Sequence, residues 1–214
     1  MALNLTGGVG NNYVIFLKLK YLLLLIISLP FFVYSQENSY KDGLKFIQKA
    51  NKAVECNKIE KAEDLINKAS NIDYGFCGNI RIKVESEIEF LKAQIANKKQ
   101  QHDIALRILD SITGCNLSVN CNKRDSLKIE TLFLKYGKEE VKNSFSFLKK
   151  VYKIENEFNS FFMVNLSELN YEFTFGYEFI LNYSDINEKG ITEKSTEFEF
   201  HSIASKYPFY KLIE

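Results

Sequence analysis

The sequence predicts a mainly α protein, α+β overall, in which stacked antiparallel helical hairpins precede a small C-terminal antiparallel β-meander. Apolar residues recur every three or four positions from Tyr40 to about Tyr152, which is the period of a helix. After about Glu155, aromatic residues alternate with other residues, which is the period of a strand. An apolar run near the N-terminus adds a third part. The expected divisions are a signal peptide at 1–35, a helical-repeat domain at 36–154 and a β-rich segment, packed on the last hairpin, at 155–214.

The N-terminal part has the features of a secretory signal peptide. Residues 21–33 are an unbroken apolar run, Lys18 and Lys20 precede it, and Gln36 would be the first residue after cleavage. The run has 13 residues, whereas a membrane span needs roughly 20. The alternative is an uncleaved anchor that also uses residues 14–17, although the two lysines interrupt it. We therefore expect an exported protein, periplasmic or secreted, without a stable membrane span after cleavage.

Charge and composition exclude several classes of protein. The chain has 28 Lys and Arg residues against 27 Asp and Glu residues, and its formal charge of +1 becomes −1 when Lys18 and Lys20 leave with the signal peptide. A nucleic-acid-binding protein usually carries a basic excess, so no nucleic-acid partner is expected. A hydrophobic content of 46% is that of an ordinary globular chain and excludes a disordered tail or a collagen-like protein.

Six helices are expected in the helical region, which contains no proline, and Gly137 should end the fifth in a left-handed conformation. The residues that mark them are Leu44, Ile47 and Val54; Ile59, Ala62, Leu65, Ile66 and Ala69; Val84, Ile88, Leu91 and Ile95; Ala105, Ile108, Leu109 and Ile112; Leu127 and Leu134; and Val141, Phe145, Leu148 and Tyr152.

The helical pattern repeats along the chain. Small residues at fixed places let two helix axes approach closely, and large residues one turn later fill the groove between them, which indicates a stacked hairpin solenoid. The alternative is an irregular helical bundle with coincidental alanines. At an offset of 43 residues, Ala50, Ala53, Ala62, Ile66 and Ala69 correspond to Ala93, Ala96, Ala105, Leu109 and Ile112, and at a further offset of 36 come Ile129, Leu132, Val141, Phe145 and Leu148.

Residues 57–73 resemble the second helix of a tetratricopeptide repeat, in which a small turn residue precedes an aromatic, an alanine, a large apolar residue and a second alanine. Ile59 replaces the aromatic here, Ile112 stands where the second unit should have an alanine, and the usual terminal proline is missing. The resemblance is degenerate and implies stacked hairpins with a surface for proteins or peptides. The residues that match the family pattern are Ala50, Ala62, Ile66 and Ala69.

All four cysteines follow the predicted cleavage site, and export permits disulfides. Cys115 and Cys121 flank a short polar loop and are the first choice for a pair, and Cys56 with Cys77 follows by elimination. However, a helix of about 15 residues would separate Cys56 from Cys77 by roughly 22 Å, which is beyond the reach of a disulfide. Pairing them would require residues 70–77 to run back along the helix. Otherwise both thiols are free and buried, or Cys77 joins the Cys115 and Cys121 loop.

Three strands are expected in the tail. Residues 171–181 alternate with aromatics on one face, residues 158–166 precede them as a second strand, and residues 191–203 follow as a third after a polar turn. An isolated meander of this size needs a partner surface, for which the last helical hairpin is the natural candidate. The alternative is an aromatic face that binds an external ligand.

The sequence contains no convincing catalytic or metal-binding constellation. It lacks G-x-S-x-G, H-E-x-x-H, a Walker-type glycine loop and C-x-x-C. His102 is expected to pack or cap at the start of a helix, and His201 to occupy an exposed strand position. We therefore expect no enzyme activity, no metal and no cofactor. The carboxylate pairs that could imitate a glycosidase dyad do not span a cleft: Glu85 with Glu89 lies on one helix, and Glu197 with Glu199 on one strand face.

These observations favour an exported, non-enzymatic helical-repeat protein that binds another protein or a peptide. The alternative is a periplasmic immunity protein or inhibitor that neutralises a toxin, and a hydrolase with a nonstandard site is the third hypothesis. The first helices of the hairpins would line the binding face. The candidate polar contacts on them are Lys45, Lys52, Lys83 and Lys92.

Overall fold

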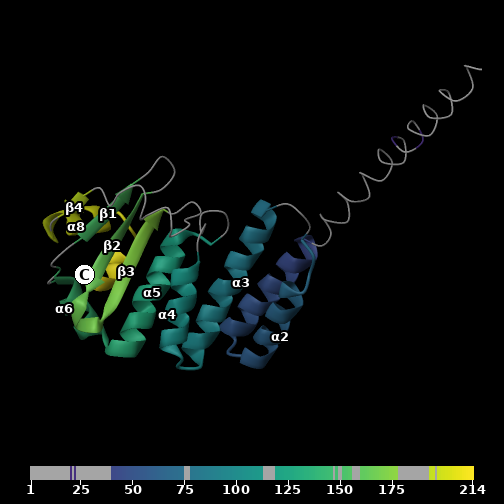
Figure 1. The fold of residues 1–214 in the computed structure, drawn as a ribbon. Helices are drawn as coiled ribbons and strands as arrows, with labels where there is room; N and C mark the ends of the chain where they lie inside the picture. Colours follow the sequence, from purple (N-terminus) through teal and green to yellow (C-terminus); the bar gives the residue numbers. More distant parts are fainter. Residues whose placement is uncertain are drawn as a thin grey trace, which may run out of the picture.

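In the computed structural model, the helices lie side by side in a row that ends at an antiparallel sheet (Figure 1). The protein is therefore mainly α and α+β overall, which confirms the predicted class. Apart from residues 20 and 22, the predicted signal peptide lies outside the described residues. The structure describes residues 20, 22, 40–74, 78–112, 119–146, 148, 151–155, 160–177, 193–195 and 197–214.

Three successive helix pairs build the row, because each helix carries an apolar stripe at helical spacing that it buries against its neighbours. The helical residues 40–55 pair with α2 (Ile59–Ser70), α3 (Gly78–Lys98) pairs with α4 (His102–Ser111), and α5 (Cys121–Tyr136) pairs with α6 (Lys138–Ser146).

The repeat of 43 residues recurs in the backbone of the first two turns. Asn57 and Gln100 both have positive φ, at 54° and 60°. In each turn the next residue donates a backbone hydrogen bond of 2.8 Å across the turn, from Lys58 N to the Ala53 oxygen and from Gln101 N to the Ala96 oxygen. The third turn differs, since Gly137 ends α5 with φ 91° and ψ 150°, which is positive φ outside the left-handed helical region.

Side-chain burial follows the same repeat. All the residues that correspond at the two offsets are buried, so the sequence pattern reflects equivalent places in the three hairpins. They are Ala50, Ala53, Ala62, Ile66 and Ala69 in the first, Ala93, Ala96, Ala105, Leu109 and Ile112 in the second, and Ile129, Leu132, Val141, Phe145 and Leu148 in the third.

Within the described residues, the sheet has four strands in the order β3-β2-β1-β4. Strands β1, β2 and β3 form a meander in which Val164 lies opposite both Val151 and Phe173, on β1 and β3 respectively. Strand β4 then crosses to the far side of β1, so the predicted simple three-strand meander is wrong in this respect. The strands are β1 (Val151–Glu155), β2 (Ser160–Leu166), β3 (Tyr171–Tyr177) and β4 (Glu193–Ser195), with the 3-10 turn η2 (Ser167–Leu169) between β2 and β3.

Two boundaries differ from the predictions. The sixth helix ends at Ser146 and the first strand begins at Val151, inside the predicted helical domain. The third predicted strand, 191–203, contains only β4 and continues into α8 (Glu197–Ala204), with α9 (Tyr210–Ile213) behind it. Phe200 and Ala204 are fully buried and one helical turn apart, so packing against the core selects a helix there over the strand pattern. Residues 178–181 of the second predicted strand lie outside the described residues.

Aromatic side chains join the sheet to the last hairpin. The Phe145 ring of α6 meets the Phe173 ring of β3 edge-on, with 5.4 Å between centroids, and stacks on the Phe200 ring of α8 at 5.8 Å. Phe175 and Phe209 complete the cluster at 4.9 Å. Because these rings share one buried core with Ile129 and Leu132 of α5, the sheet is packed on the last hairpin.

Candidate functional site

A groove runs along the first helices of the three hairpins. It consists of two hollows of about 570 Å³ and 740 Å³, and Glu55 lines both. We call the first the N-half, which lies between residues 40–55, α3 and the start of α5, and the second the C-half, which lies between residues 40–55, α3 and the middle of α5. The N-half is lined by Leu44, Ile47, Gln48, Asn51, Lys52, Glu55, Lys83, Glu87, Phe90, Leu91, Val119 and Lys123, and the C-half by Val54, Glu55, Gln94, Asn97, Lys98, Gln100, His102, Leu127, Glu130 and Leu134.

The N-half combines an apolar wall with an excess of lysines. Phe90 is only partly buried on that wall. Lys83 and Lys123 act on Glu87, whose carboxyl pKa is raised by burial more than these two lysines lower it. Lys52 is exposed on the same side. This half therefore carries three cations and two carboxylates.

The C-half carries two carboxylates, Glu55 and Glu130, against one lysine, Lys98. Leu134 projects from α5 with 60% of its surface exposed, although it lines the hollow. One turn earlier, Glu130 has a carboxyl pKa that burial raises, and no cation in the described part of the chain lowers it. The amide oxygen of Gln94 is buried and has no hydrogen-bond partner among the described residues. Lys98 and His102 line the same hollow as Gln94 and Glu130, and they are its basic side chains.

A chain of hydrogen bonds holds the floor of the C-half. His102 Nδ1 lies 3.2 Å from Asn97 Oδ1, the Asn97 amide donates to Thr131 Oγ1 at 2.7 Å, and the Thr131 hydroxyl donates to the Leu127 carbonyl at 2.6 Å. This chain links the end of α3, the start of α4 and the middle of α5. The packing role expected for His102 at a helix start is consistent with these contacts.

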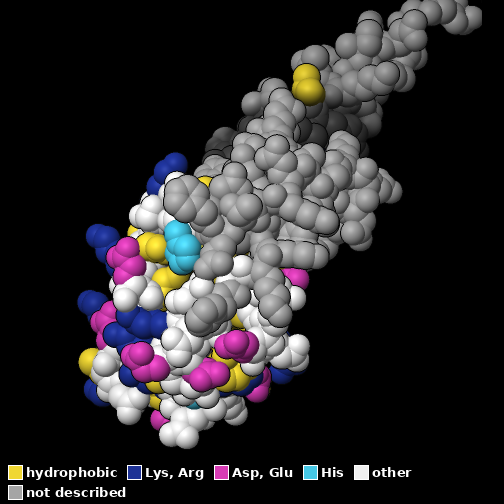
Figure 2. Space-filling view, turned by 90° about the vertical axis from the view of Figure 1, so that its left-hand side faces the viewer, with side chains coloured by type: hydrophobic (Ala, Val, Ile, Leu, Met, Phe, Trp, Pro, Cys, Tyr) yellow, Lys and Arg dark blue, Asp and Glu magenta, His cyan; other side chains and the backbone are white. Residues whose placement is uncertain are grey.

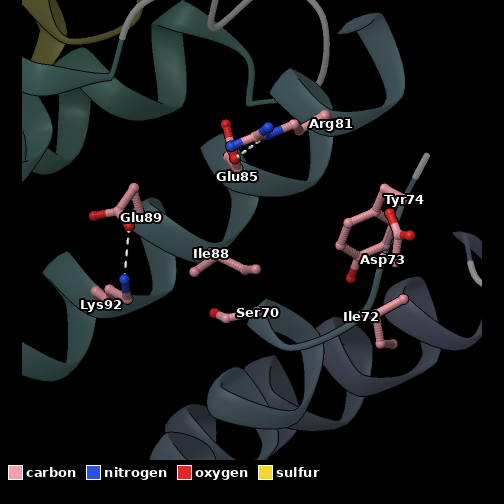
Figure 3. Close-up of a pocket in the computed structure, with 9 residues that line it drawn as sticks. All are labelled: Ser70, Ile72, Asp73, Tyr74, Arg81, Glu85, Ile88, Glu89 and Lys92. Atoms are coloured by element: carbon pink, nitrogen blue, oxygen red, sulfur yellow. Dashed lines mark hydrogen bonds and ion pairs between the residues drawn. The ribbon is translucent and has the colours of Figure 1, made fainter. Parts of the chain in front are cut away.

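The structure brings two of the four candidate lysines into the groove, Lys52 and Lys83. Lys45 instead pairs with Asp42 at 2.9 Å on the exposed surface. Lys92 lines a different hollow of about 490 Å³, where Figure 3 shows it pointing at Glu89, with 2.7 Å between the paired atoms.

Four of the five charged side chains that line that third hollow are paired with one another along α3. Arg81 pairs with Glu85 at 2.7 Å, one turn away, as Lys92 does with Glu89, and Tyr74 lies across the hollow from both pairs (Figure 3). The Tyr74 hydroxyl donates to the Ala69 carbonyl at 2.7 Å. Glu85 and Glu89 thus each form an ion pair with a basic residue of the same helix, and they do not face each other across a cleft.

A second polar constellation, which the sequence reading missed, lies between α5 and β3. Arg124, Asp125 and Lys128 are at most 1% exposed. Arg124 Nε donates to Asp125 Oδ1 at 2.9 Å, and Lys128 Nζ lies 2.8 Å from Asp110 Oδ1. The Tyr171 hydroxyl also donates to Asp110 Oδ1 at 2.9 Å, and burial together with that carboxylate raises the tyrosine pKa, so the phenol remains protonated.

These charges have a structural use, because β3 is an edge strand of the sheet. The Gly176 N–H donates to Asp125 Oδ2 at 3.1 Å, and Lys128 Nζ donates to the Thr174 carbonyl at 3.3 Å and to its Oγ1 at 3.0 Å. Side chains of α5 therefore occupy two of the backbone groups that an edge strand would otherwise offer to another strand, the Gly176 N–H and the Thr174 carbonyl. Burial raises the pKa of Asp125, and the neighbouring Arg124 and Lys128 oppose that shift.

The cysteines depart from the predicted pairing. Cys56 is free and exposed, so the predicted disulfide between Cys56 and Cys77 is wrong, and so is the alternative of a buried Cys56 thiol. The physical reason is distance: Cys56 lies at the turn of the first hairpin, a helix length before the segment that contains Cys77, which is beyond the reach of a disulfide. Cys121 is buried and disulfide-bonded. Its possible partners, Cys77 and Cys115, lie outside the described residues.

The remaining candidates for chemistry do not converge. Within the described ranges, no group of three or more His, Cys, Asp or Glu side chains could hold a metal ion. His201 lies on α8, not on the predicted strand, and its Nδ1 is 2.9 Å from the Tyr210 hydroxyl. The side chains of Glu197 and Glu199 lie outside what the structure describes.

No family model, curated protein or solved structure matches the chain. The resemblance to tetratricopeptide repeats therefore stays a prediction. In the parts of the chain that the structure describes, none of the helices has both the length and the apolar character of a membrane span.

Proposed function

We propose that the protein is an exported, non-enzymatic helical-repeat protein that binds another protein or a peptide in the groove. The observation that carries this proposal is the position of Leu134. A single exposed leucine is ordinary on a protein surface, but Leu134 lines a hollow that continues over three helices. When a partner binds there, it buries the apolar side chain and displaces water from it.

The repeat geometry and the charge distribution support the proposal. The first two hairpins have equivalent turns, and all three have equivalent burial, as a stacked array requires; such arrays present extended binding surfaces. Figure 2 shows basic and acidic side chains interspersed on the described part of one end of the molecule, without a patch of one sign. Partner choice would then depend on shape and on individual contacts rather than on bulk charge.

The test is a selection of linear random peptides displayed on phage against the purified protein. Replacing Leu134 with Ser should weaken the selected peptides, because it removes the exposed apolar contact. Ile104→Ser is the matched control, since Ile104 is also a large exposed aliphatic residue, at 40%, but lies on α4 and lines a different, smaller hollow of about 370 Å³. Selection of no peptide, or equal loss in both variants, would contradict the proposal.

A further inference from the structure

We propose that the C-half of the groove binds a peptide segment in which a Lys or Arg residue stands beside an aliphatic one. The basic side chain would lie on Glu130 and the aliphatic side chain on Leu134. This inference rests on the proposed function and adds the chemistry of the partner.

The exposed carboxylate of Glu130 lines the C-half and has no donor in the described part of the chain. The donors on Asn97 and Thr131 are used within the hydrogen-bonded floor. A Lys ammonium or an Arg guanidinium supplies only donors, so it complements this surface, whereas an acidic side chain would add further acceptors.

Apolar side chains flank the Glu130 carboxylate along α5. Leu127, Glu130 and Leu134 follow one another at helical intervals on α5, so an apolar contact lies on each side of the carboxylate. A long basic side chain can lie along such apolar surface with its charged end on the carboxylate. Lys98 is the competing cation of the C-half, and it neither forms an ion pair with Glu130 nor lowers its pKa.

The two halves of the groove differ in their balance of charged side chains. The N-half has three lysines against two glutamates, and the C-half has Glu55 and Glu130 against one lysine. A basic residue is therefore placed better over the middle of α5 than over its start. The experiment must distinguish the basic and aliphatic peptide from two other occupants, an acidic peptide segment and a second copy of this chain.

The experiment selects linear random peptides against the wild type, Glu130→Gln and Glu130→Lys. The wild type should enrich peptides with adjacent basic and aliphatic residues, Glu130→Gln should bind them about tenfold more weakly, and Glu130→Lys should enrich acidic residues at the same place. Glu60→Gln, on the exposed face of α2, is the matched control and should bind as the wild type does. Circular dichroism checks that each variant is folded.

The outcomes separate this inference from the proposed function. Peptides that require Leu134 but are acidic, or that ignore both Glu130 variants, would overturn the basic partner and leave the groove as a binding surface. Selection of no peptide together with self-association in sedimentation, lost in Leu134→Ser, would instead indicate a second copy and overturn both. Enrichment of basic–aliphatic peptides that Glu60→Gln weakens as much as Glu130→Gln does would also refute the inference.

Discussion

Replacing Lys128 with Met tests whether buried charges attach α5 to the edge of the sheet. The ammonium of Lys128 is completely buried, lies 2.8 Å from Asp110 Oδ1, and donates to Thr174 Oγ1 at 3.0 Å. Methionine has a similar volume and flexibility, so the change removes the charge and the donors without leaving a large cavity. What remains is a carboxylate without its cation and an edge carbonyl of β3 without a donor.

The magnitude follows from the burial of each partner. Removing one member of a buried ion pair costs about 3–5 kcal/mol, but the Asp110 side chain is 35% exposed and keeps its hydrogen bond from Tyr171. The lower end of that range, about 3 kcal/mol, is therefore expected. For a chain of this size, that loss lowers the melting temperature by about 6–12 °C.

The assay is urea and thermal unfolding followed by circular dichroism. Lys68→Met is the matched control, because Lys68 pairs with Asp64 at 2.7 Å, nearly the same distance, but the two side chains are 54% and 60% exposed. An exposed pair of this kind contributes about 0–1 kcal/mol. A cycle with Asp110→Asn should give a coupling of about 1–3 kcal/mol. Equal losses in Lys128→Met and Lys68→Met would refute the reasoning.

Three further predictions concern the turns, the thiols and export. Gln100→Gly should leave stability equal or raise it by up to about 1 kcal/mol, because glycine adopts the φ of 60° without strain, and Asn57→Gly should gain less because asparagine tolerates that region better; melting temperatures compare the two. Iodoacetamide should alkylate Cys56 in the native, unreduced protein but not Cys121, as a non-reducing peptide map would show, and a cross-linked Cys56 would contradict the structure. N-terminal sequencing of the protein from an exporting host should begin at Gln36, and an intact N-terminus would contradict cleavage.

The helical part of the fold was predictable because its signal is local and repeated. An alanine such as Ala62 or Ala105 is completely buried where two helices meet, and the same spacing recurs in the next hairpin. The turns were less visible: Asn57 is a residue type that suggests positive φ, whereas Gln100 is not, and only the offset between them relates the two. Backbone geometry here follows the repeat more closely than the identity of the turn residue does.

The C-terminal part was harder to predict because its packing overrides local preference. Residues 197–204 contain Phe198 and Phe200 at a spacing of two, which reads as a strand, yet they form α8. The burial of Phe200 and Ala204 against Phe145 and Phe175 is a tertiary effect that no window of sequence contains.

The N-half of the groove contains two of the predicted lysines, whereas the C-half was missed for a reason that lies in α5. Leu127 and Leu134 mark this helix in the sequence as if they faced the core, but Leu134 is 60% exposed in the groove, while Arg124 and Lys128 are buried. The hydrophobic period correctly predicts the helix, but it wrongly predicts that Leu134 faces the core rather than the groove.

This inversion makes α5 the element in which two requirements meet. Its buried charges satisfy the open edge of β3, which an apolar face could not do, because edge N–H and C=O groups need polar partners. Away from this edge, α5 carries the exposed Leu134 one turn after Glu130, although an exposed leucine contributes little to folding. Departures of this kind from the usual pattern concentrate at functional sites. The fold alone explains the buried charges of α5, because they contact the edge of β3. It does not explain the exposed Leu134 beside Glu130. A bound partner would bury this leucine.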